Sequence, residues 1–175
     1  MPKYRKMLND WDAVHIQAIV HAVEGQSKET LIQWTTDYAE RVMLPLWETY
    51  CPQDTRPKEA IEAARAWVRK EIKLPAAKAV ILQCHNAARD CEGNPAAQAA
   101  ARAIGQSAST IHAATHCMGL PLYGAVAVGY ENAGWDASWD SVHEQAILEC
   151  ARMIKALEEI SIPDDPNPAK LNWQC

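Results

Sequence analysis

Three histidines are the residues whose spacing could support chemistry in this sequence. His112 and His116 are four residues apart, so on a helix they would share one face. Paired histidines at this spacing can hold a metal ion, and His85 is the best candidate for a third ligand. The intervening sequence, His-Ala-Ala-Thr-His, lacks the glutamate of the zinc-protease pattern. We therefore expect histidines that lie in or beside the core with hydrogen-bonded rings, and we predict no metal or other cofactor.

Two arginines extend this set of polar side chains. His85 and Arg89 are also four residues apart, and Arg102 lies in a neighbouring alanine-rich segment. A polar layer between two helices is therefore possible, and the small residues around Gly105 would let the helices approach closely. Such a layer could also bind a metal or a small molecule, which is our alternative hypothesis for the function. The layer would consist of His85, Arg89, Arg102, His112 and His116.

An activated nucleophile is not evident in the sequence. Cys84 and His85 are adjacent and would point about 100° apart on a helix. Neither a phosphate-binding loop nor a dinucleotide-binding glycine pattern occurs. The cysteines form no CxxC pair and favour small buried apolar residues over a disulfide framework. We expect a protein that is not an enzyme. The six cysteines are Cys51, Cys84, Cys91, Cys117, Cys150 and Cys175.

Helices must position these residues, because the apolar residues recur with helical period along most of the chain. Ser27 is a plausible N-cap, Gly25 a stop, and Pro57, Pro75 and Pro95 suit first turns. Pro45 should kink or interrupt the helix that contains it. The helices are predicted over residues 10–24, 27–50, 57–72, 75–91, 95–118, 122–131 and 136–160.

The composition supports the same fold class. The 175 residues include about 30 alanines, seven tryptophans and no phenylalanine, which favours closely packed helices with a few tryptophan anchors. We predict an all-α, single-domain multi-helix bundle or short helical array of about six or seven helices over residues 1–162. Residues 163–175 would form an extended, proline-rich tail. With neither a secretory signal nor a membrane-length apolar run, we expect a soluble cytoplasmic protein.

Charge is distributed unevenly along the chain, whose net charge is −5. Residues 103–151 contain no lysine or arginine but five acids. Either this segment is mostly buried, or it presents an acidic surface with tryptophans to a basic protein partner. An acidic chain without a basic stripe argues against binding nucleic acid. The candidate contact residues are Glu131, Trp135, Asp136, Trp139, Asp140 and Glu144.

Several stretches together resemble one known family. They are LIQW at 31–34, AERVMLPLWE at 39–48, RPKEAIEAARAW at 56–67 and HNAAR at 85–89, followed by AARAIG at 100–105 and TIH at 110–112, with His116. The run is similar to the immunity-protein-5-like family, an alanine-rich, all-helical family associated by gene neighbourhood with bacterial polymorphic toxin systems. The resemblance covers residues 10–130, and residues 56–67 are its most specific part. Gln106 stands where the family often has histidine, and Cys84 where it often has alanine.

The resemblance implies a protein that binds and neutralises a cognate toxin domain, and it assigns no catalytic residue. We expect a non-enzymatic helical protein with a protein partner, of open oligomeric state. Since residues after 131 match nothing in the resemblance, we expect the partner-specific surface among the acids and tryptophans of residues 131–144.

Overall fold

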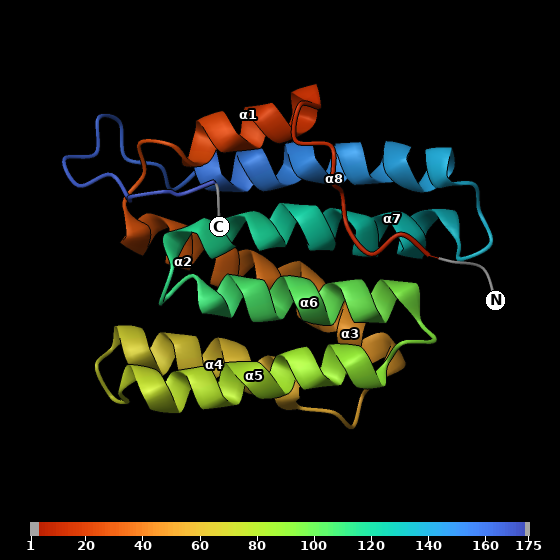
Figure 1. Ribbon diagram of the computed structural model, residues 1–175, viewed down its shortest axis with the longest axis horizontal. Helices are drawn as coiled ribbons and strands as arrows, with labels where there is room; N and C mark the ends of the chain where they lie inside the picture. The colour runs from red at the N-terminus through yellow and green to blue at the C-terminus, as the bar shows by residue number, and fades with distance from the viewer. Residues whose placement is uncertain (1–3, 174–175) are drawn as a thin grey trace.

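The fold is all-α, as the helical periodicity predicts. A computed structural model describes residues 4–173, which form seven continuous helical runs and no strand. Helices packed side by side give a stack that is extended along one direction (Figure 1). The α-helices are α1 (Val14–Val23), α2 (Lys28–Tyr38), α3 (Leu44–Tyr50), α4 (Arg56–Val68), α5 (Leu74–Asp90), α6 (Pro95–Ser109), α7 (Ala125–Ala133) and α8 (Trp139–Glu158).

Irregular helical turns join some of these helices. A π-helical turn over Ala39–Met43 connects α2 to α3 and ends just before Pro45. Because proline has no N–H for the carbonyl four residues earlier, the regular hydrogen-bond ladder is interrupted here, as predicted, without ending the helical run. A 3₁₀ turn over Ala114–Met118 and a π turn over Leu120–Gly124 lead into α7.

Side-chain caps begin several helices, and the cap at Ser27 is where the sequence predicts one. The Ser27 hydroxyl accepts a hydrogen bond from the Thr30 N–H at 3.2 Å. Asn94 and Ser138 cap α6 and α8 in the same way. Gly25 has φ +87°, a left-handed conformation that suits glycine, and it follows α1.

Several predicted helix boundaries are wrong, and two of them show why. The first helix begins at Val14 and not near residue 10, with Ala13 in extended conformation at its N-cap and no side-chain cap. The fifth predicted helix ends at Ser109 and not near Met118, because the chain turns at residues 110–113 before the 3₁₀ turn. The alanine-rich pattern continues through this break without glycine or proline, so no local signal marks it.

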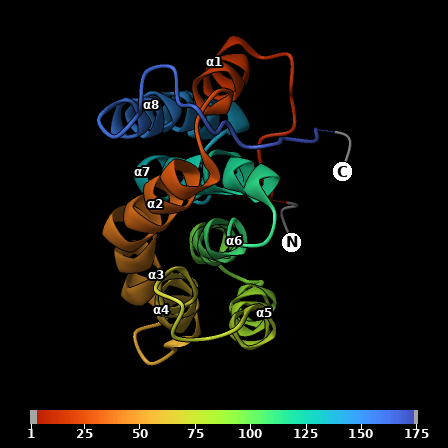
Figure 2. The ribbon, with the colours of Figure 1, turned by 90° about the vertical axis from the view of Figure 1, so that its left-hand side faces the viewer.

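Helix α6 occupies the centre of the stack. It contacts α2, α3, α4, α5 and α7, and Figure 2 shows it enclosed by them. Of its 15 residues, 13 are buried, and alanine lets the neighbouring helices pack closely around it. Residues 103–130 contain no lysine, arginine, aspartate or glutamate and are almost entirely buried. Burial therefore explains most of the base-free segment, although the acids after residue 130 lie at the surface apart from Glu149.

Hydrogen bonds of Trp34 and of the buried Glu149 carboxylate link α2 to α8. The Trp34 indole N–H donates to the Met153 carbonyl at 2.9 Å, which ties α2 to α8. Beside it, the Tyr38 hydroxyl donates to Glu149 at 2.5 Å, and Arg152 donates to the other oxygen of that carboxylate at 2.9 Å. These contacts satisfy a carboxylate that is only 2% exposed.

Cysteines occupy two kinds of environment. Cys84, Cys117 and Cys150 are buried, as expected of small apolar residues, and burial raises the pKa of each thiol to about 12. Cys51 and Cys91 are half-buried thiols whose sulfur atoms lie 3.5 Å apart. Cys175, the sixth, lies outside the described residues.

The C-terminal segment runs back over the start of α2. The Ala169 N–H donates to the Gln26 carbonyl at 2.8 Å, and the Ser27 N–H donates to Asp165 at 3.1 Å. Trp173 packs against Trp11, with ring centroids 5.9 Å apart. Among the described helices, none combines the length and the apolar character needed to cross a membrane.

Candidate functional site

The predicted histidine pair forms, but not on one helix. His112 lies in the turn after α6 and His116 in the 3₁₀ turn, which corrects the prediction of a shared helical face. Their rings nevertheless lie 4.8 Å apart between centroids. His116 Nδ1 is 2.6 Å from Gln106 Oε1, so the Gln106 side chain holds this ring by a hydrogen bond.

His85 approaches the same region from α5. Its pKa is lowered by burial first, and then by the charges of Arg102 and Arg89 and by His116. Burial also lowers the pKa of His116. For His112, burial, His116 and the charges of Lys78 and Lys28 all lower the pKa. All three imidazoles therefore favour the neutral form, and for His85 and His112 nearby positive charges add to the effect of burial.

A metal centre is not assembled by these residues. Within residues 4–173, no group of three His, Cys, Asp or Glu side chains converges closely enough to hold a metal ion. The His85 ring instead packs on Gly105, where a Cβ, if the residue had one, would lie 2.6 Å from the ring. Arg89 is exposed and donates to Asn86 on its own helix. The arrangement is that of a packed polar layer with one buried imidazole atom, His112 Nδ1, lacking a hydrogen-bond partner within the described part of the chain.

The two tryptophans of the acidic segment are half-buried and engaged by the protein itself. Trp135 lies 5.5 Å from the ring of Tyr50, whose hydroxyl donates to Glu131 at 2.5 Å. Trp139 stacks on His143 at 5.6 Å, and the Arg5 guanidinium lies 4.5 Å above its ring. Contacts within the protein therefore cover part of each ring, and only the rest of its surface is accessible to a partner protein. All four of the predicted contact acids are exposed: Glu131, which accepts the hydrogen bond from Tyr50, and Asp136, Asp140 and Glu144.

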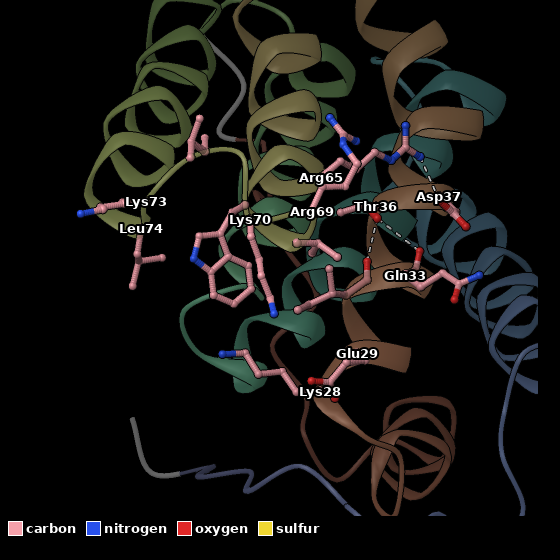
Figure 3. Close-up of a pocket in the computed structure, with 14 residues that line it drawn as sticks. Lys28, Glu29, Gln33, Thr36, Asp37, Arg65, Arg69, Lys70, Lys73 and Leu74 are labelled. Atoms are coloured by element: carbon pink, nitrogen blue, oxygen red, sulfur yellow. Dashed lines mark hydrogen bonds and ion pairs between the residues drawn. The ribbon is translucent and has the colours of Figure 1, made fainter.

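A groove that is not evident in the sequence lies between α2 and the α4–α5 turn (Figure 3). Its volume is about 800 Å³. An apolar floor is formed by Ile32, Trp67, Val68, Ile72 and Leu74, of which Val68 is 49% exposed. The polar lining residues are Lys28, Glu29, Gln33, Thr36, Asp37, Arg65, Arg69, Lys70 and Lys73.

The rim of this groove is basic, although the chain as a whole is acidic. Five of its lining residues are bases and two are acids. Arg65 is paired with Asp37 at 2.9 Å and with Glu40 at 2.7 Å, and the hydrogen bond from Arg65 lowers the pKa of Glu40.

The lysines of the rim are less engaged than Arg65. Lys28, Lys70 and Lys73 make no ion pair with any residue in the described range 4–173. The Lys28 ammonium lies 5.5 Å from the centre of the Trp67 ring. The rim therefore carries positive charge that the described part of the protein does not neutralise by direct pairing.

Lys70 occupies an unusual backbone position at this rim. The Glu71 N–H donates to the Ala66 carbonyl and the Lys70 N–H to the Trp67 carbonyl, both at 2.9 Å, which is the Schellman pattern at the end of α4. Lys70 has φ +62° at the position where such an ending usually has glycine. Because no glycine marks this ending in the sequence, the helix is predicted to continue to residue 72. That prediction is wrong, since α4 ends at Val68.

The sequence does not reveal the groove, because the lining residues lie between positions 28 and 74 in three separate elements that only the fold brings together. Trp67 follows the apolar period of α4 and is expected to anchor the core together with Trp34 and Trp47. The last two are at most 2% exposed, whereas Trp67 is half-buried and lines the groove. The signal that could have indicated the groove is the cluster of bases at 65–73 around a tryptophan.

The chain was compared with protein families, curated proteins and solved structures. No curated protein and no solved structure matches it. A family model described as "Imm-5 like putative immunity protein" matches residues 21–168. The match includes every residue that lines the groove, and it extends past residue 131, so the expectation that the acidic segment lies outside the family resemblance is wrong. The chain belongs to the Imm-5 like putative immunity protein family.

Proposed function

We propose that this protein is a cytoplasmic immunity protein that binds a cognate toxin domain and blocks it without catalysis. The family match over residues 21–168 carries the proposal. The surface chemistry supports it: the groove offers an aromatic side chain, arginines and an apolar floor, which are features of protein contact surfaces.

The character of the groove also favours binding over catalysis. Among the described residues that line it, none is histidine, cysteine or serine, and the Thr36 hydroxyl donates to the Ile32 carbonyl at 2.7 Å. His85 and His116 lie outside the lining of the groove, where His85 packs on Gly105 and His116 hydrogen-bonds with Gln106. A nucleophile paired with a base is the usual requirement of covalent catalysis, and these lining residues do not supply one.

The test is a titration against the cognate toxin domain, to be sought among the genes that neighbour this one in its host. Co-expression should restore growth of cells that carry the toxin, and the purified proteins should elute together. Loss of toxin activity should reach completion at a fixed molar ratio, because a blocking protein is consumed as it binds. Complete inhibition by a small fraction of an equivalent would indicate an enzyme acting on the toxin or its product, and absence of both binding and protection would overturn the proposal.

A further inference from the structure

The basic groove is the surface of this molecule whose chemistry best defines an occupant. Its rim has a surplus of bases over acids, and three lysines there are without an ion pair to another described residue. Because unpaired charges of one sign attract the opposite sign, the rim favours a negatively charged occupant. The apolar floor requires that the same occupant also carry an apolar group.

We propose that the groove binds an acidic segment of the toxin domain, one that places a large apolar side chain against Trp67 and Val68. The inference rests on the proposed function and specifies the surface through which it acts. Trp67 is half-buried and Val68 is 49% exposed, so both can contact a partner without prior unfolding. Fully desolvated aromatic contacts of this kind commonly dominate binding energy.

The dimensions of the groove suit a peptide segment. Its α2 wall runs from Lys28 to Asp37, nine residue steps of a helix, or about 14 Å. That length matches between two and three turns of a partner helix, which would lie along the groove with its apolar face inward. Arg65 pairs with Asp37 and Glu40, and Arg69 pairs with Glu71, so these charges largely cancel. Among the described residues, the lining charges outside these ion pairs are those of Lys28, Lys70 and Lys73 against the single acid Glu29, and the lysines dominate.

Lys70 gives an independent reason to regard the rim as functional. A non-glycine residue with φ +62° costs conformational energy that glycine would not. Here it places a lysine on the groove rim. Residues in strained backbone conformations are concentrated at binding sites, where the contacts of the side chain offset the conformational energy that the backbone costs.

The experiment measures affinity between the full chain and the purified toxin domain by calorimetry, at low and high salt. Two variants change the rim and the floor separately: the double variant Lys70→Gly/Lys73→Glu, and Val68→Glu. Each should raise Kd by about ten-fold or more, and the effect of the rim variant should shrink at high salt. Lys155→Glu is the matched control, because it reverses a lysine charge at an exposed position of α8 outside the groove, and it should leave Kd unchanged.

The outcomes separate this inference from the proposed function. If the wild-type chain binds the toxin domain and both groove variants bind equally well, the groove inference is overturned while the proposed function stands. If the wild-type chain does not bind the toxin domain, the proposed function is overturned, and the groove inference that rests on it is overturned with it.

Two other occupants are tested in parallel. Cosedimentation with phosphatidylglycerol vesicles that depends on Lys70 and Lys73 would assign the groove to a membrane. Concentration-dependent dimerisation that the groove variants abolish would assign it to a second copy of the chain. Either result would overturn the inference.

Discussion

The Cα of Gly105 on α6 lies against the imidazole ring of His85 on α5. A Cβ at position 105 would come within 2.6 Å of His85 Cε1, closer than carbon atoms approach in folded proteins. The contact joins the central helix to the polar layer, and the histidine can occupy this layer only because residue 105 has no side chain. The small residues around Gly105 predict a close helix approach, and the structure identifies the partner.

Gly105→Ala should therefore destabilise the protein, because the methyl group must displace the half-buried His85 ring. The expected loss in the free energy of unfolding is about 1–3 kcal/mol, measured by urea denaturation. Gly93→Ala is the matched control: nothing lies within 4 Å of its Cβ position, and the change should stay within about 0.5 kcal/mol. Adding His85→Ala to Gly105→Ala should recover part of the loss, and simple additivity of the two changes would show that the contact is not the cause.

Stability should fall as the pH drops from 7 to 5. The pKa of His85 is lowered by burial and by Arg102 and Arg89, while an unfolded histidine has a pKa of about 6.5. Below that value the unfolded state binds a proton that the folded state resists, so the unfolded state gains stability. The full effect of His85 is present above pH 6.5 and is lost progressively as the pH falls toward its lowered pKa.

The measurement compares urea denaturation of the wild type and His85→Gln across this pH range. One proton corresponds to a slope of at most about 1.4 kcal/mol per pH unit, and partial solvation of His85 makes the real slope smaller. His85→Gln should flatten the profile by that share, and His15, His112 and His116 also contribute because their pKa values are lowered too. A profile unchanged by the substitution would mean that His85 titrates alike in both states.

Local sequence signals predict the helices of this fold well. The features that they do not predict depend on contacts between segments that are far apart in the sequence. Ser27 and Pro95 mark helix starts because capping and proline geometry act within one turn. The break after Ser109 has no such marker, although it places His112 and His116 in successive turns where their rings contact each other. The groove is hidden for the same reason: its walls are separate segments, each of which has the pattern of an ordinary amphipathic helix.

Lys70→Gly should make the folded protein more stable. Glycine adopts the left-handed conformation at the end of α4 without steric cost, whereas lysine at φ +62° does not. The net gain in the free energy of unfolding should be about 0.5–1 kcal/mol, since glycine also has more freedom in the unfolded chain. Thermal denaturation measures it, with Lys73→Gly as a control at a position without positive φ, where no gain is expected. A variant that is less stable than the wild type would show that Lys70 makes a stabilising contact.

Mild oxidation should link Cys51 to Cys91 before any other pair among the five cysteines that the structure describes. Their sulfur atoms are 3.5 Å apart and half-buried, whereas Cys84, Cys117 and Cys150 are buried in the core. With hydrogen peroxide as oxidant, the two thiols lose two protons and two electrons, and the peroxide is reduced to two waters. Peptide mapping should find the 51–91 link, and Cys91→Ser should abolish it. Since burial and the contact with Cys51 raise the pKa of Cys91 to about 12, that thiol is protonated at neutral pH and the link should form slowly.

Charge reversal on the acidic segment tests the contact surface predicted from the sequence. The triple variant Asp136→Lys, Asp140→Lys and Glu144→Lys changes only exposed side chains, so the fold should survive. If the toxin presents a basic surface here, association should slow at low salt, and the difference should shrink as salt screens the charges. Stopped-flow association measures this, and the same three reversals at the exposed residues Asp12, Glu158 and Glu159 provide the control. Because the groove has the opposite sign, the two surfaces must contact different parts of a toxin. Equal association rates for all three proteins at low salt would remove the acidic segment from the interface and leave the groove to account for binding.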